Sequence, residues 1–126
     1  VDRSLFRHVP ECERGRKVFV YDGRFPKTEA AKRIYNQKVI DAVVAALPHE
    51  EFVMSSDLNA AYEDMPKIYA MCRIGIRLTV HDGNANTVQE MAAMGIPVVH
   101  NQSDYGLKWK SVGDVVGHIR ESRMPK

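Results

Sequence analysis

Residues 73–100 read RIGIRLTVHDGNANTVQEMAAMGIPVVH, and this stretch decides the fold class. It opens with an apolar, β-branched run at residues 73–80, which is typical of a buried strand. A polar loop then leads into a helix expected over residues 86–94, which Gly95 ends. A second strand is expected at residues 97–100. A strand, a helix and another strand in immediate succession predict a parallel βαβ unit.

The same alternation of strands and helices extends over the rest of the chain. The other strands are expected at residues 17–23 and 51–55, and the other helices at residues 28–48, 62–71 and 111–122. This order predicts a single α/β domain over residues 1–126, with an open parallel sheet of about four to five strands and helices on both faces. Residues 1–16 are expected to form an irregular or helical lead-in.

Composition limits the class of protein. The 126 residues are 44% hydrophobic and 27% charged, which is the balance of a soluble globular domain rather than a disordered chain. No apolar run approaches the length of a membrane span, and the N-terminus lacks a signal-peptide pattern. Cys12 and Cys72 stand apart from any metal-ligand pattern, so we expect a reduced, cytoplasmic protein without a metal site. Residue 1 is Val rather than Met, which is compatible with a piece of a longer chain.

The net charge of +2 is unevenly distributed along the sequence. Residues 1–38 carry ten Lys and Arg against five Asp and Glu, residues 39–106 carry three against nine, and residues 107–126 carry five against two. The basic ends are compatible with an anion, a membrane surface or a missing partner domain, although we favour an ordinary solvated surface. Trp109 lies between two lysines, but no wider basic and aromatic pattern accompanies it, so no nucleic-acid partner is expected.

Polar clusters follow every expected strand, and the most unusual one precedes the helix at residues 86–94. Ligands of open parallel sheets bind beyond the carboxyl ends of the strands, where these clusters lie. Gly83 lets the backbone approach a ligand, and Asn86 is a good N-cap for a helix whose free amides attract an anion. Glu90 lies one turn into the helix and can point back over its start. Together they suit a pyrophosphate and a ribose, although Asp82–Gly83 can equally be an ordinary turn and Glu90 a solvated residue.

Residues 82–99, DGNANTVQEMAAMGIPVV, resemble the C-terminal domain of retaining nucleotide-sugar glycosyltransferases with the GT-B fold. The shared pattern is an acid, seven residues, a Glu, then small residues and G-x-P-V-V. The two acids here are Asp82 and Glu90. This chain has Asp where Glu is usual at the first position, and Met91 where a small Ala is common.

The resemblance extends more weakly over residues 17–122. Arg24 matches a Gly-Arg pair that follows the first strand in this family, whereas Lys27 comes earlier than the usual spacing. The family often has another strand and helix before Tyr62, and these are missing here. The N-terminal acceptor-binding domain of the family also has no counterpart in these residues.

The resemblance implies a Rossmann-like domain that binds a UDP- or GDP-sugar and takes part in retaining glycosyl transfer. Asp82 and Glu90 would be the catalytic residues, with Asp82 near the donor sugar and Glu90 on the ribose hydroxyls. The other contacts to the diphosphate or the donor sugar would come from Arg24, Lys27, Gly83, Asn84, Asn86 and Thr87. No metal or other cofactor is implied, because a helix dipole and basic residues can neutralise the leaving diphosphate.

The partners implied are the nucleotide-sugar and an acceptor-binding domain or chain, with any membrane contact peripheral and made by the full-length enzyme. The chain alone is expected to be inactive. Two alternatives stay open. One is a non-catalytic α/β binding or regulatory module, and the other is half of a different nucleotide-sugar enzyme such as an epimerase.

Overall fold

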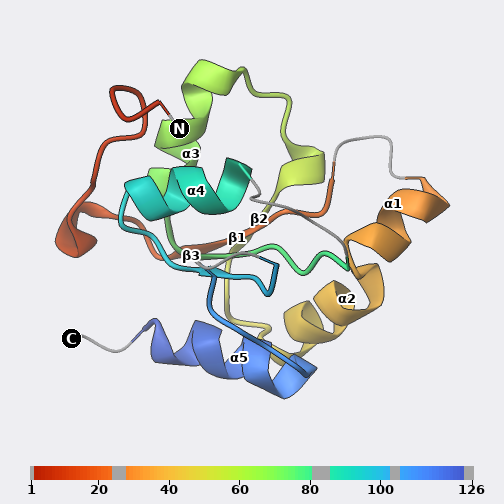
Figure 1. Ribbon diagram of the computed structural model, residues 1–126. Coiled ribbons are helices and arrows are strands. Elements are labelled where there is room, and N and C mark those ends of the chain that lie inside the picture. Colours follow the sequence, from red (N-terminus) through yellow and green to blue (C-terminus); the bar gives the residue numbers. More distant parts are fainter. Residues whose placement is uncertain (1, 24–27, 81–85, 103–105, 124–126) are drawn as a thin grey trace.

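The computed structural model describes residues 2–23, 28–80, 86–102 and 106–123, and it shows an α/β fold (Figure 1). Within these residues four strands form one all-parallel sheet in the order β2-β1-β3-β4. The strands are β1 (Lys17–Val20), β2 (Phe52–Met54), β3 (Cys72–Ile76) and β4 (Val98–Val99). The helices are α1 (Glu29–Ile34), α2 (Gln37–Ala46), α3 (Met65–Ala70), α4 (Asn86–Ala93) and α5 (Val112–Glu121), and the short 3-10 helices are η1 (Glu11–Glu13), η2 (Ser55–Asp57) and η3 (Tyr62–Asp64).

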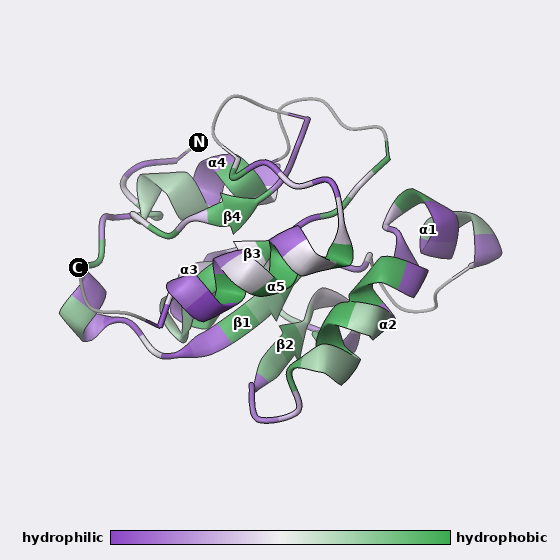
Figure 2. Ribbon diagram, turned by 90° about the horizontal axis from the view of Figure 1, so that it is seen from below, coloured by the Kyte–Doolittle hydropathy of each residue, from purple (hydrophilic) through white to green (hydrophobic). Residues whose placement is uncertain are grey.

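Helices cover both faces of the sheet, with α3 and α4 on one face and α2 and α5 on the other (Figure 1). Because side chains alternate along a strand, β1 sends Val18 and Val20 towards α2 and α5, and Phe19 towards α3 and α4. All three side chains are fully buried. Burying a side chain of this size contributes about 1.5–3 kcal/mol, so an apolar layer on each face stabilises the sheet. Figure 2 shows the apolar residues along β1 and β2 and the mixed surface of α5.

The strand order creates a switch point between β1 and β3. The chain passes from β1 to β2 on one side, then crosses back to β3 on the other side of β1 and continues to β4. The connections that leave β1 and β3 therefore run in opposite directions. Open α/β sheets bind their ligands beyond the carboxyl ends of the strands at such a point.

The helix predicted over residues 28–48 is wrong in detail, because it is divided into α1 and α2. Thr28 caps α1 and accepts a hydrogen bond from the backbone N of Ala31 at 3.0 Å. Asn36 then takes a left-handed conformation, with φ at 54°, and its side chain donates to the carbonyl of Leu78 beyond β3. Asn is among the few residues that adopt this backbone conformation readily. The chain therefore turns at Asn36, where its side chain bonds to Leu78, although the spacing of apolar residues predicts one continuous helix.

The lead-in at residues 2–16 contains η1 and packs over α3 and α4. Phe6 is 1% exposed, and its ring contacts the ring of Tyr69. Cys12 is exposed and Cys72 is buried, and both are free thiols. Trp109 packs against the core between the sheet and the α2/α5 layer. In the part of the chain that the structure describes, no helix has the length and apolar character needed to cross a membrane.

Candidate functional site

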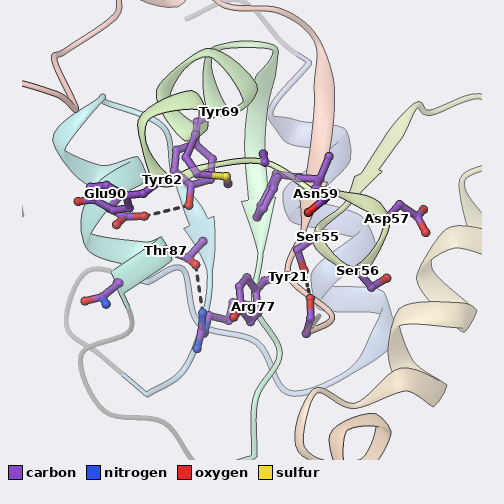
Figure 3. A pocket seen from close by; sticks show the side chains of 16 residues that line it. Tyr21, Ser55, Ser56, Asp57, Asn59, Tyr62, Tyr69, Arg77, Thr87 and Glu90 are labelled. Atoms are coloured by element: carbon purple, nitrogen blue, oxygen red, sulfur yellow. Dashed lines mark hydrogen bonds between the residues drawn. The ribbon is translucent and has the colours of Figure 1, made fainter. Parts of the chain in front are cut away.

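A cavity of about 970 Å³ opens at the carboxyl ends of β1 and β3, on the face that carries α3 and α4 (Figure 3). This volume lies in the upper part of the range of about 300–1,000 Å³ that is usual for small-ligand sites. The side chains that Figure 3 labels come from the end of β1, the segment after β2, α3 with η3, and the β3–α4 region. The cavity therefore coincides with the switch point of the sheet.

One wall of the cavity is α4, which packs close to the sheet. Gly75 in β3 permits this approach, because a Cβ atom there would lie only 2.8 Å from Sδ of Met91 on α4. Asn86, Thr87 and Glu90, all in the first two turns of α4, line the cavity. Asn86 is the first residue of α4, at the start that the sequence predicts for this helix, and its role as N-cap stays a prediction.

Glu90 presents a buried carboxylate at this wall, with the residue 8% exposed. The hydroxyl of Tyr69 donates a hydrogen bond of 2.9 Å to Oε1 of Glu90. Burial raises the pKa of Glu90, and the Tyr69 hydrogen bond and the charge of Arg77 offset only part of the rise. Among the described residues, no Lys, Arg or His side chain forms a salt bridge with Glu90. Such a carboxylate suits a ligand that brings hydroxyl donors.

Aromatic side chains surround Glu90. Tyr69 is buried and packs edge-on against Phe19, with ring centroids 5.1 Å apart. Tyr62 lies at the rim and is 51% exposed, although its ring packs edge-on against Phe6 at 5.5 Å. Burial and the Glu90 carboxylate raise the pKa of both tyrosines, so both hydroxyls keep their protons at neutral pH. An exposed ring beside a carboxylate offers a stacking surface for a sugar or a base.

Arg77 lies at the cavity wall just beyond the carboxyl end of β3. Its Cζ atom lies 4.0 Å from the ring centroid of Tyr21, which is within cation–π range. Its Nη1 atom donates a hydrogen bond of 3.0 Å to Oγ1 of Thr87 in the first turn of α4. A positive charge thus lies beside the helix end at which backbone amides carry positive partial charge.

Asp22 holds the opposite wall of the cavity in place. The side chain is fully internal, at 1% exposed, and accepts hydrogen bonds from the backbone N and Oγ of Ser56 at 2.9 and 2.8 Å. The backbone N of Asp22 donates to Oγ of Ser55 at 3.0 Å, and that hydroxyl donates to the carbonyl of Gly23 at 2.7 Å. These bonds fix the segment after β2, which continues to Asn59 along the cavity. We therefore assign Asp22 a positioning role.

The structure brings together three of the residues that the sequence predicts for the site, namely Asn86, Thr87 and Glu90. The others lie outside the described residues: Arg24, Lys27, Asp82, Gly83 and Asn84. The predicted set omits Tyr69 and Arg77. The polar residues that follow the strand expected at residues 51–55 line the opposite wall. Nothing local in the sequence distinguishes Tyr69 from a core residue of an amphipathic helix.

No protein-family model matches this chain, and no curated protein matches it in sequence. The described residues contain no group of three or more His, Cys, Asp or Glu side chains placed to hold a metal ion. The features that bear on function are therefore the cavity, the burial and polarity of its walls, and the motif around Glu90.

Proposed function

We propose that this chain is the donor-binding half of a retaining GT-B-type glycosyltransferase, with the cavity holding a nucleoside diphosphate sugar. One observation carries the proposal. Glu90, the second acid of the family-like motif, is a buried carboxylate that lines a cavity at the β1/β3 switch point. A buried carboxylate without a salt bridge to the described residues is costly, and hydroxyl donors of a ligand would stabilise it.

The arrangement of the walls supports this ligand class. Glu90 would accept hydrogen bonds from the ribose hydroxyls, each contributing about 1.5–3 kcal/mol because one partner is charged. The exposed ring of Tyr62 lies beside it and would pack against the base or the sugar. The diphosphate would then extend towards the N-terminal end of α4, where the helix amides favour an anion.

The role of the chain in transfer follows from this placement. The diphosphate is the leaving group, and donors that point at it stabilise the charge that develops as the glycosidic bond breaks. The acceptor would come from the partner domain that closes over the cavity. Bringing donor and acceptor together supplies much of the rate, so the chain by itself should bind the donor and transfer nothing.

Calorimetric titration of the chain with uridine, UDP, GDP and the corresponding UDP- and GDP-sugars tests the proposal. We expect weak, saturable binding of at least one nucleoside diphosphate, and no sugar transfer to any acceptor. The matched control is Glu121→Gln, which removes an exposed carboxylate on α5, on the opposite face of the sheet, and should leave binding unchanged.

A folded chain that binds no nucleotide would favour the non-catalytic module instead. Robust glycosyl transfer by the chain alone would contradict the half-enzyme assignment while leaving the nucleotide site intact.

A further inference from the structure

We infer that Arg77 is the phosphate-binding cation of this cavity and that, with the first turn of α4, it forms a subsite for a diphosphate group. The inference deepens the proposed function and relies on it for the rest of the ligand. The sequence motif gave this role to Arg24 and Lys27, which lie outside the described residues. Arg77 follows β3 in the sequence, whereas Arg24 and Lys27 follow β1.

The charge of the wall is the first argument. Arg77 is the only Lys or Arg among the described residues that line the cavity, and it lies at the carboxyl end of the central strands. Ligands of parallel sheets bind at this edge. An anion in the cavity would therefore meet the guanidinium at the point where it also meets the end of α4.

The second argument is that Arg77 is held in one orientation. The ring of Tyr21 packs against the guanidinium at 4.0 Å, and Oγ1 of Thr87 accepts from Nη1 at 3.0 Å. A guanidinium carries its N–H donors in a rigid plane, a geometry that suits a two-point contact to a phosphate. Side-chain entropy that is lost on folding need not be lost again on binding.

The third argument is that Arg77 and Glu90 are close enough to contact the diphosphate and the ribose of one nucleotide. Thr87, which orients Arg77, and Glu90 are three residues apart on α4 and therefore neighbours on one face of the helix. A nucleotide likewise carries its ribose hydroxyls and its 5′-diphosphate on adjacent parts of one molecule. Arg77 and Glu90 thus match the anionic and hydroxyl-bearing parts of the same ligand.

The experiment compares inorganic pyrophosphate, uridine and UDP as titrants of the wild-type chain and of Arg77→Gln, with folding checked by circular dichroism. We expect Arg77→Gln to weaken the binding of pyrophosphate and of UDP by about tenfold or more, with uridine changed by less than about twofold. Arg77→Lys should recover only part of the loss, because an ammonium cannot make the two-point contact. The matched control is Arg120→Gln on α5, which should leave all three affinities unchanged.

If Arg77→Gln does not fold, Thr87→Val serves in its place, because it removes the hydroxyl that orients the guanidinium and keeps the shape of the side chain. It should weaken pyrophosphate and UDP more than uridine. Equal losses for uridine and UDP, or no pyrophosphate binding by the wild-type chain, would overturn the inference and leave the nucleotide assignment standing. Arg77-dependent pyrophosphate binding without any uridine binding would support the inference and contradict the proposed function.

Discussion

Two glutamates place their carboxylates against this domain, one at each end of the sheet, and their surroundings differ. Glu50 lies at the amino ends of the strands, with its side chain 6% exposed, and it contacts Nη2 of Arg73 at 2.5 Å and Nε of Arg123 at 2.8 Å. Glu90 lies at the carboxyl ends and is 8% exposed, with Tyr69 as its neutral donor. The Glu50 carboxylate thus contacts two guanidinium groups, whereas the Glu90 carboxylate forms no salt bridge with the described residues and is offset only in part by the more distant charge of Arg77.

The pKa values of Glu50 and Glu90 are shifted in opposite directions. Burial acts to raise the pKa of Glu50, but the hydrogen bonds and charges of Arg73 and Arg123 outweigh it, and the pKa lies below its usual value. Burial also raises the pKa of Glu90, and there the opposing contacts are too weak to reverse the shift. A carboxylate that the protein neutralises internally stabilises the fold, whereas one that it leaves uncompensated at a cavity wall is available to a ligand.

The largest effect is expected at the compensated end. Glu50→Ala leaves the buried guanidinium of Arg73 without its carboxylate, which should lower the free energy of unfolding by about 3–5 kcal/mol in urea denaturation. The matched control is Glu51→Ala, because Glu51 pairs with Lys17 on the surface and such pairs contribute about 0–1 kcal/mol. Similar small losses for both variants would mean that the Glu50 cluster does not stabilise the fold as described.

At Glu90, a substitution should change ligand affinity rather than the stability of the fold. Glu90→Gln keeps the shape of the side chain and removes the charge, so the affinity for a nucleoside diphosphate should fall by about tenfold or more. The free energy of unfolding should stay the same or rise, because a costly buried charge has been removed. Calorimetry and urea denaturation on the same samples measure both. A variant that loses stability and keeps its affinity would reverse the two roles.

Lowering the pH should affect nucleotide binding at Glu90 before it affects the stability that Glu50 contributes. The raised pKa of Glu90 means that its carboxylate takes up a proton above the usual value of 4.5, so nucleotide affinity should fall as the pH drops towards that value. The lowered pKa of Glu50 means that its stabilising contribution is present above pH 4.5 and is lost only as the pH falls through a lower value. Titrations from pH 7.5 to 4.5 should therefore show weakening binding to a folded chain, and Glu90→Gln should reduce that dependence to the part that comes from the phosphate of the ligand, whose second pKa is about 6. Affinity that is independent of pH in the wild-type chain would exclude an ionised Glu90 from the contact.

The smallest effect is expected at Tyr69. Tyr69→Phe removes the donor to Glu90 and keeps the ring against Phe19, so nucleotide affinity should fall by roughly two- to tenfold. The residual pH dependence should move to higher pH, because the hydrogen bond from Tyr69 opposes the rise in the Glu90 pKa. An affinity equal to that of the wild-type chain, with no shift in the pH profile, would show that Tyr69 acts only in packing.

The sequence predicted the fold where local patterns agree with the tertiary structure. The βαβ unit at residues 73–100 could be located from the sequence. Its two strands are short apolar runs, whereas apolar residues recur at helical spacing between them, and a polar loop and Gly95 mark the ends of the helix. The break at Asn36 could not, because it accompanies a hydrogen bond to the carbonyl of Leu78, 42 residues away.

In the candidate site, too, the sequence predicts some residues and not others. The spacing of two acids around a loop predicts Glu90 as a site residue, and helical periodicity predicts its position one turn into the helix. Arg77 lies inside the run that the sequence predicts as a strand, residues 73–80, and the alternation of side chains along a strand does not show which of them borders a cavity. The orientation of Arg77 depends on Tyr21 and Thr87, which come from two other elements of the fold.

The most direct measurement of the central claim is a titration of the isotopically labelled chain with UDP and GDP, followed by the chemical shifts of backbone amides. If the cavity binds a nucleoside diphosphate through Glu90, at least one of the two should cause saturable shifts that cluster at Tyr21, Thr87 and Glu90, with little change in α2 and α5 on the opposite face. No saturable shift with either nucleotide, or shifts centred on α5, would contradict the account.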